Sequence, residues 1–168
     1  MGKVILICGK ICAGKTRYAK KMAKDIKGVI LSTDEIMLGL FGQYLGDMHD
    51  EIAEKTEIYL FKKAVEIIFS GINVILDWGF WTREKRQFAT KYFNNSGIKV
   101  EWHYVEVDNE NWRRNISKRN NAVINNKENF YFIDDNVVEK FMCLFEEPQP
   151  DEIDIWYKND EENTEYKG

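Results

Sequence analysis

The 168-residue chain contains little cysteine, histidine or proline: three cysteines, two histidines and two prolines. Cys8, Cys12 and Cys143 form no C-x-x-C pair and no metal-ligand spacing, so a structural zinc site is not expected. We expect reduced thiols that are buried or partly buried. The proline pair at residues 148–150 is too short to be an interdomain linker, and the length is that of one domain.

Long hydrophobic runs are also lacking. The longest, such as Val4–Cys8, have the length of a strand, far below the ~20 residues that cross a bilayer. The first residues lack the hydrophobic region of a signal peptide. We therefore expect a cytoplasmic protein.

Excess charge is confined to the C-terminal end. The formal net charge is −4, and residues 151–168 hold seven acids against two lysines, so residues 1–150 carry about +1. This balance gives no general attraction to polyanions, and bulk nucleic-acid binding is not indicated. We expect one domain over residues 1–158 and a flexible acidic tail over residues 159–168.

Apolar segments of strand length alternate with amphipathic segments of helix length. The pattern predicts strands at residues 3–8, 28–33, 73–76, 99–107 and 153–157, and helices at residues 15–27, 50–70, 82–95, 109–120 and 134–145. Residues 34–49, which include three glycines, are expected to be irregular. The alternation predicts an α/β fold with an open parallel sheet covered on both faces.

The clearest motif lies between the first predicted strand and helix. Residues 9–16, GKICAGKT, match G-x-x-x-x-G-K-[ST] in full, the pattern of a phosphate-binding P-loop. Backbone N–H groups of such a loop point at phosphate oxygens, the lysine reaches the β- and γ-phosphates, and the Thr hydroxyl binds Mg²⁺. The predicted nucleotide ligands are Gly9, Ile11, Cys12, Ala13, Gly14, Lys15 and Thr16, with Thr16 also a metal ligand.

Two carboxylates end predicted strands, where ligands of open α/β sheets bind. Asp34 follows the second strand, and it can accept the proton of an attacking hydroxyl or, alternatively, cap the next helix. Asp77 ends the third strand, and it can serve magnesium or the acceptor, or be a turn residue.

Aromatic and basic side chains follow these carboxylates. Trp78, Phe80 and Trp81 can line an acceptor site or belong to the core, and Arg83 and Arg86 can bind an anionic acceptor or be solvated. Farther along, Arg113, Arg114, Lys118 and Arg119 form a basic cluster. An arginine from a mobile segment can stabilise the charge of phosphoryl transfer, and we expect Arg114 or Arg119 to do so, with Arg119 also contacting the nucleotide.

Together these motifs resemble the P-loop kinases of the polynucleotide-kinase, zeta-toxin and chloramphenicol-phosphotransferase type, and in particular their small AAA-type ATP-binding members. The resemblance rests on GKICAGKT, STDE, LDWGFWTREKR, RRNISKRN and FEEPQPDE, of which Asp77–Arg86 is the most specific. It implies a P-loop NTPase fold with a sheet in 2-3-1-4-5 order, Mg-ATP as donor and Asp34 as base. It also implies a lid at about residues 109–133 and adenine near residues 147–150. Two positions depart from the family: Met37 stands where several relatives have Arg, and Cys12 where Ser or Gly is common.

Three functions follow as hypotheses. The first is transfer of the γ-phosphate of Mg-ATP to a hydroxyl of a small molecule such as an antibiotic, sugar or nucleoside. The second is phosphorylation of a polynucleotide 5′-hydroxyl, which calls for a basic channel. The third is an ATP-binding switch or partner-binding module with little turnover, which would need neither Asp34 nor the basic cluster.

Overall fold

The computed structural model describes residues 1–43, 45–127 and 130–159. Within them, the strands form one parallel sheet in the order β2-β3-β1-β4-β5. The strands are β1 (Val4–Cys8), β2 (Gly28–Leu31), β3 (Asn73–Asp77), β4 (Val100–Glu106) and β5 (Ile155–Lys158). The α/β class expected from the alternation of segments and the strand order implied by the resemblance are both confirmed.

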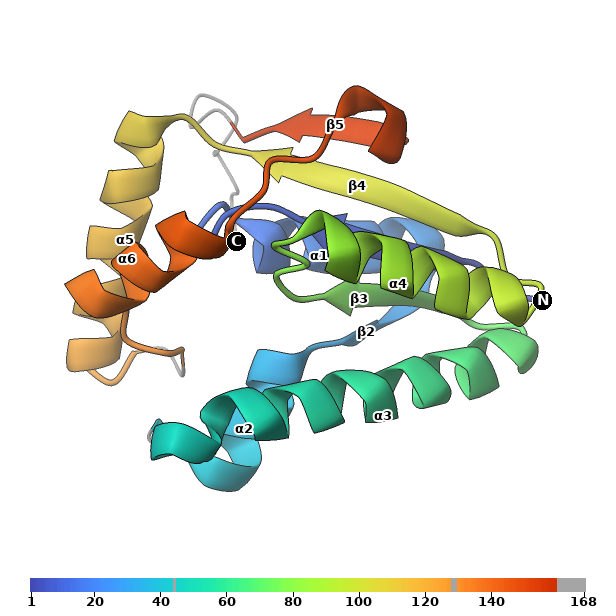
Figure 1. The fold of residues 1–168 in the computed structure, drawn as a ribbon, viewed down its shortest axis with the longest axis horizontal. Coiled ribbons are helices and arrows are strands. Elements are labelled where there is room, and N and C mark those ends of the chain that lie inside the picture. The colour runs from blue at the N-terminus through green and yellow to red at the C-terminus, as the bar shows by residue number, and fades with distance from the viewer. Residues whose placement is uncertain (44, 128–129, 160–168) are drawn as a thin grey trace.

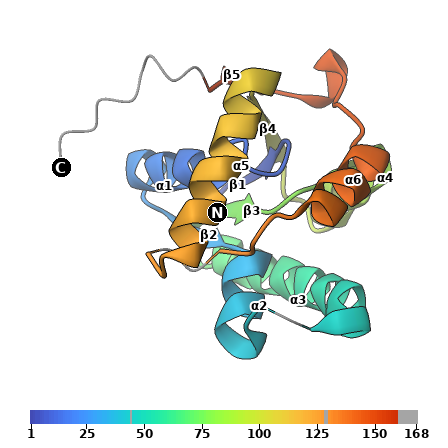
Figure 2. The ribbon, with the colours of Figure 1, turned by 90° about the vertical axis from the view of Figure 1, so that its left-hand side faces the viewer.

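Helices cover both faces of the sheet and its carboxyl ends. They are α1 (Lys15–Ile26), α2 (Thr33–Phe41), α3 (His49–Phe69), α4 (Arg83–Asn95), α5 (Asn109–Ile124) and α6 (Asp135–Leu144), with short 3₁₀ turns η1 (Gly46–Met48) and η2 (Pro150–Glu152). In Figure 1, α1 lies behind the sheet and α3 and α4 lie in front of it. Figure 2 looks onto the carboxyl ends of the strands, with α5 crossing in front of β1.

The core has two parts, one on each face of the sheet. On one face, Leu6 and Leu76 pack with residues of α3 and α4 such as Phe61 and Phe93. On the other face, side chains of alternate strand residues pack against α1, α5 and α6, with Phe141 of α6 fully buried. The central strands are buried on both faces, which explains why they appear in the sequence as continuous apolar runs.

The segment expected to be irregular contains a helix, and that expectation is wrong. Helix α2 begins after Ser32, whose Oγ accepts a hydrogen bond from the N–H of Glu35 (3.4 Å). Asp34 and Glu35 lie in the first turn, where negative charge is favourable. The helix ends at Gly42, which has φ 73°. Gly39, inside the helix, obscured this pattern in the sequence.

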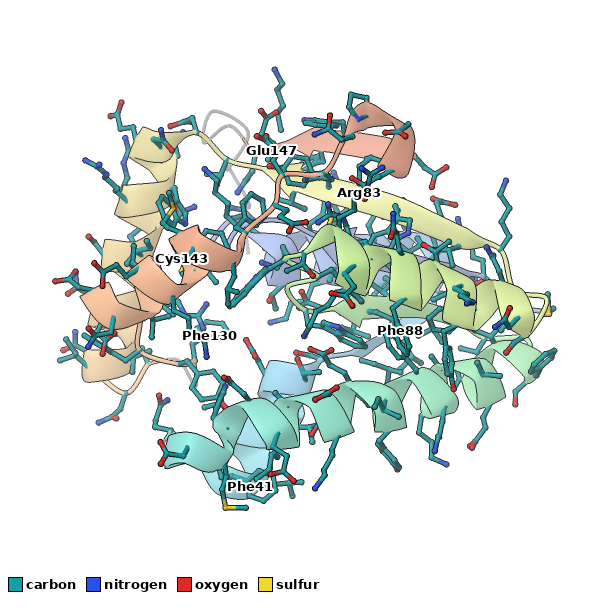
Figure 3. The ribbon with its side chains drawn as sticks, viewed as in Figure 1. Phe41, Arg83, Phe88, Phe130, Cys143 and Glu147 are labelled. Atoms are coloured by element: carbon teal, nitrogen blue, oxygen red, sulfur yellow. The ribbon has the colours of Figure 1, made fainter. Side chains whose placement is uncertain are left out.

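Two features bear on other expectations. The described helices are too short or too polar to cross a membrane. All three cysteines are free, but only Cys8 and Cys12 are buried or partly buried; Cys143, on α6 (Figure 3), is exposed, against the expectation for it.

Candidate functional site

The P-loop curls between β1 and α1 with a backbone that demands glycine at two positions. Gly9 has φ 148°, and a Cβ there would lie 2.5 Å from the carbonyl oxygen of Val105 on the neighbouring chain segment. Gly14, at the start of α1, has φ 94°. Cys12 also has positive φ, 56°, which is uncommon for a residue with a side chain. The sequence motif is therefore matched by the backbone shape that a phosphate cradle requires.

Lys15 folds back across this loop. Its Nζ donates to the carbonyl oxygens of Gly9 (3.0 Å) and Lys10 (2.6 Å). Burial lowers the pKa of Lys15, while the carboxylates of Asp77 and Asp34 act in the opposite direction. The lysine is thus held over the loop with both carboxylates nearby.

Three side chains hold the outward-facing carbonyls of the P-loop. The indole Nε1 of Trp112 donates to Ile11 (2.7 Å), the amide of Asn115 to Cys12 (3.0 Å), and the amide of Asn159 to Ala13 (2.8 Å). These three hydrogen bonds restrict the conformation of the P-loop from the side of its carbonyls. The sequence assigns Asn159 to the tail, yet this residue is part of the site; residues 160–168 lie outside the described residues.

Asp77 lies at the end of β3, next to the start of α1. It is buried, and burial raises its pKa, while a hydrogen bond from Thr16 and the charge of Lys15 act in the opposite direction. Its Oδ2 has no hydrogen-bond partner among the described residues. A buried carboxylate oxygen without a partner is costly and therefore calls for a ligand.

Asp34 lies in the first turn of α2 with an exposed side chain. The helix cap is Ser32, so capping does not account for Asp34. Burial is the main cause of the pKa shifts of Lys15, Asp77 and Cys12, and the negative charge of Asp34 acts on all three in the upward direction. The end of β2 therefore brings an exposed carboxylate to the lysine of the P-loop.

The two arginines expected at the phosphates differ in their surroundings. Arg119 of α5 donates from Nη1 to Cys12 Sγ (3.8 Å) and from Nε to the carbonyl oxygen of Tyr131 (3.0 Å). Arg114 pairs with Glu110 on the same helix (3.2 Å), and its side chain is 44% exposed. Arg119 thus contacts the P-loop at Cys12.

Arg83 and Arg86, the basic residues of the Asp77–Arg86 motif, both contact Glu152. Arg86 is 2% exposed and binds both carboxylate oxygens of Glu152 (3.1 and 3.2 Å) and the carbonyl oxygens of Phe80 (3.1 Å) and Glu146 (3.0 Å). It therefore ties the β3–α4 connection to the segment that leads into β5. Arg83 is more exposed, and its Nε lies 4.0 Å from Glu152.

The aromatic residues of this motif are mainly core. Trp78 and Phe80 are 5% and 2% exposed and stack on one another with ring centroids 5.0 Å apart, beside Phe61. Trp81 is half-buried and lies edge-on to Phe141. This burial of Trp78 and Phe80 is what the core alternative predicts, although the indole Nε1 atoms of Trp78 and Trp81 have no partner among the described residues.

The segment at residues 147–150, near which the resemblance places adenine, lies beside β4. Glu147 accepts a hydrogen bond from the hydroxyl of Tyr104 (3.3 Å). At the P-loop itself, the contact from the C-terminal part of the chain comes from Asn159.

Sequence reasoning missed Trp112, Asn115 and Asn159. The first two lie with Arg119 on one face of α5, at spacings of three and four residues, and this spacing was visible in the sequence. Their partners lie about a hundred residues earlier, however, and no local pattern indicates a contact over that separation. Asn159 had no signal beyond its position after the last strand.

Known proteins share both the sequence pattern and the fold. A family model described as an AAA domain, AAA_33, matches residues 4–148. No curated protein matches the chain. Among solved structures, the Mycobacterium tuberculosis APS kinase CysC in complex with AMPPNP and APS is 20% identical, with a TM-score of 0.65 over 95% of this chain and 89% of that one.

Two other solved structures show the same fold. An unliganded sugar kinase from Janibacter sp. HTCC2649 is 16% identical, with a TM-score of 0.63 over 94% of this chain and 86% of that one. Chaetomium thermophilum Kti12 in complex with ADP-AlF3 is 14% identical, with a TM-score of 0.67 over 92% and 87%. At these identities the likeness to solved structures shows the P-loop NTPase fold. The family model matches most of the chain, and the chain is therefore a member of the AAA_33 family of AAA domains.

Proposed function

We propose that the protein is an ATP-dependent phosphotransferase that transfers the γ-phosphate of Mg-ATP to a hydroxyl of a small molecule. The observation that carries this proposal is the position of Asp34, an exposed carboxylate whose charge acts on the P-loop lysine and on Asp77. A protein that only binds nucleotide needs no carboxylate there. Two proteins of the same fold are a sugar kinase and an APS kinase, which agrees with a small-molecule acceptor.

The P-loop would hold the β- and γ-phosphates through its backbone N–H groups. Lys15 would exchange its bonds to the carbonyl oxygens of Gly9 and Lys10 for bonds to phosphate oxygens. Arg119, beside Cys12, would add positive charge where the transferred group becomes more negative. The AMPPNP and ADP-AlF3 complexes of two neighbours support nucleotide binding by this fold.

Thr16 and Asp77 fit a magnesium ion. Their oxygens lie together, as the hydrogen bond between them shows, and Asp77 Oδ2 is buried without a partner among the described residues. Hard oxygen ligands of this kind, few in number and joined by phosphate oxygens, are those that Mg²⁺ takes in phosphoryl-transfer sites. When bound, the ion would neutralise charge on the β- and γ-phosphates.

Asp34 would act as the general base. It would accept the proton of the acceptor hydroxyl while the acceptor oxygen forms a bond to the γ-phosphorus. The bond between that phosphorus and the β–γ bridging oxygen would break, and its electron pair would leave with ADP. Positioning and charge neutralisation would supply most of the rate enhancement.

The experiment is a transfer screen with [γ-³²P]ATP and pooled sugars, nucleosides, antibiotics and 5′-hydroxyl oligonucleotides. We expect the wild type to label a small molecule and Lys15→Ala to label nothing. Lys21→Ala, which removes an exposed lysine of the neighbouring helix α1, is the matched control and should retain labelling. Labelled oligonucleotides would favour a polynucleotide kinase, and tight Mg-ATP binding without labelling would favour a binding module.

A further inference from the structure

The segment after α5, residues 130–133, is held by two side-chain amides. The Nε2 of Gln43, which follows α2, donates to the carbonyl oxygen of Phe130 (2.6 Å), and its Oε1 accepts from the N–H of Phe132 (3.3 Å). Asn120 of α5 pairs in the same two-point manner with the backbone of Ile133 (2.7 and 2.9 Å). In Figure 3, Phe130 lies on the side of α5 and α6 that faces α2. The segment is thus fixed between α5 and the α2–α3 connection.

Tyr131 is at the centre of this segment. Its carbonyl oxygen accepts from Arg119, which also contacts Cys12 of the P-loop. Its ring meets the ring of His49 edge-on, with centroids 5.4 Å apart. These contacts place Tyr131 between the P-loop side and the start of α3.

The hydroxyl of Tyr131 is buried and has no hydrogen-bond partner among the described residues. Leaving a buried hydroxyl without a hydrogen-bond partner is unfavourable, so such a group needs an explanation. Burial raises the pKa of Tyr131, and the negative charge of Asp34 raises it further. The phenol is therefore a neutral hydrogen-bond donor on the same side of the site as Asp34. A ligand held beside Asp34 would supply the missing partner.

Charge on this side of the site disfavours an anionic ligand. Lys140 of α6 is bound to Asp50 (2.8 Å), and Lys85 of α4 to Glu57 (3.0 Å). These two cations are paired with carboxylates, and Lys15 and Arg119 serve the phosphates in the proposed function. The charge that remains beside Tyr131 is that of Asp34, which is exposed. An anion placed beside Asp34 would be repelled at short range.

We propose that Tyr131 is an acceptor-binding residue whose hydroxyl donates a hydrogen bond to an uncharged, hydroxyl-bearing acceptor held beside Asp34. Gln43 and Arg119 act as positioning residues. Gln43 binds the backbone on both sides of Tyr131, at Phe130 and Phe132, and Arg119 binds the carbonyl oxygen of Tyr131 itself. The inference rests on the proposed kinase function and adds to it the charge class of the acceptor and the residue that recognises it.

The test uses three pairs of candidate acceptors: glucose and gluconate, uridine and UMP, and glycerol and glycerol 3-phosphate. Transfer from [γ-³²P]ATP is measured for the full chain, for Tyr131→Phe and for Tyr59→Phe. The last is a matched control, because Tyr59 is 55% exposed on α3. Gln43→Ala is a second variant that leaves the hydroxyl in place but frees the segment that presents it.

We expect the wild type to label an uncharged member at least ten times faster than its anionic partner. Tyr131→Phe should raise the KM for that acceptor by about 3- to 10-fold, which corresponds to the loss of one hydrogen bond. The KM for ATP should stay within twofold of the wild-type value. Gln43→Ala should change the acceptor KM in the same direction, and Tyr59→Phe should change neither KM.

Preference for an anionic member, or an acceptor KM that Tyr131→Phe leaves unchanged, would overturn the inference while the kinase function stands. Failure of the wild type to label any member would contradict the kinase proposal for this panel, and the inference with it. Equal losses of ATP and acceptor binding in Tyr131→Phe would show a merely structural role and would also overturn it.

Discussion

At the scale of single residues, the carboxyl ends of the strands hold a carboxylate that the folded chain stabilises poorly. Asp77 is 4% exposed, and burial raises its pKa despite the nearby Thr16 and Lys15. Such groups are common at functional sites, where a ligand compensates for them. Stability and ligand binding should therefore respond to Asp77 in opposite directions.

We predict that Asp77→Asn stabilises the ligand-free protein at pH 7. Because the folded pKa of Asp77 lies above the unfolded value, the folded state retains its proton longer, and the free energy of unfolding falls as pH rises through that interval. The neutral variant escapes this loss and should gain on the order of 1 kcal/mol at pH 7. The gain should vanish below about pH 4, where the unfolded carboxyl is protonated as well.

Urea unfolding from pH 3 to pH 8 measures this effect, with the exposed Asp47→Asn as control. The same Asp77 variant should bind Mg-AMPPNP more weakly than the wild type. An Asp77→Asn protein that is less stable than the wild type at pH 7 would contradict the prediction.

Arg86 shows a different use of a buried charge. Its side-chain hydrogen bonds, to Glu152, Phe80, Trp81 and Glu146, join the β3–α4 connection to the segment before β5. We predict that Arg86→Ala lowers the free energy of unfolding by about 3–5 kcal/mol, because Glu152 loses its partner. Arg83→Ala, at a 4.0 Å contact with the same Glu152 and with a half-exposed side chain, should cost less than about 1 kcal/mol. Equal losses in the two variants, measured by urea unfolding, would be evidence against this role of Arg86.

Residues that act through local motifs could be predicted, and residues that act through distant contacts could not. The P-loop and the two strand-end carboxylates follow from local pattern and from the rule that ligands bind at the carboxyl ends of parallel strands. The sequence left Trp78 and Phe80 open between core and site, since apolar aromatics suit both. For Arg86 the sequence suggested either acceptor binding or a solvated helix face. The structure shows instead a buried ion pair with Glu152, and local sequence does not reveal this pair because the two residues are 66 positions apart.

At the scale of elements, helix α5 serves as a brace for the P-loop. Trp112, Asn115 and Arg119 lie on one face of the helix and contact Ile11 and Cys12. Cys12 has a left-handed conformation that a non-glycine residue adopts only at a cost, and the brace holds it there. Nucleotide affinity should therefore depend on side chains of α5 that never touch the nucleotide.

We predict that Asn115→Ala weakens the binding of Mg-AMPPNP about 5- to 30-fold. In this variant the carbonyl of Cys12 loses its only side-chain donor among the described residues, so the P-loop becomes less ordered without a ligand. Part of the binding free energy is then spent on ordering the loop, and the affinity falls. Isothermal titration calorimetry measures the affinity. Asn121→Ala, at an exposed position of the same helix, should bind within twofold of the wild type, and equal affinities of the two variants would contradict the brace.

The elements themselves were mostly predictable, because strands and long helices carry strong periodicity. Helix α3 was expected at residues 50–70 and is found at His49–Phe69. Helix α2 was missed, since a nine-residue helix with an internal glycine has little periodicity to detect. Its cap, Ser32, and the acids of its first turn were present in the sequence as a weak signal.

At the scale of the whole molecule, ligand sites and stability are linked through the sheet. The P-loop follows β1, Asp34 follows β2, and Asp77 is the last residue of β3, so a ligand that contacts all three also joins three strands. A nucleotide that binds only the folded state should raise the unfolding temperature by mass action.

We predict that Mg-AMPPNP at 100 times its Kd stabilises the wild type by about 2.7 kcal/mol. Lys15→Ala should lose most of this stabilisation, because the lysine provides the side-chain charge nearest the phosphates. Thermal unfolding with and without the ligand measures it. Full stabilisation of Lys15→Ala would mean that the nucleotide binds elsewhere.

The central claim is that Asp34 makes this P-loop protein a phosphotransferase, and the most direct measurement compares Asp34→Asn with Glu35→Gln. Both substitutions remove one exposed negative charge from the first turn of α2. With the acceptor that the screen labels, Asp34→Asn should lower transfer by about 10²- to 10⁴-fold and leave the Kd for Mg-AMPPNP within about threefold, while Glu35→Gln changes neither by more than about threefold. Transfer by Asp34→Asn at the rate of Glu35→Gln would contradict the assignment of the base, and with it the proposed mechanism.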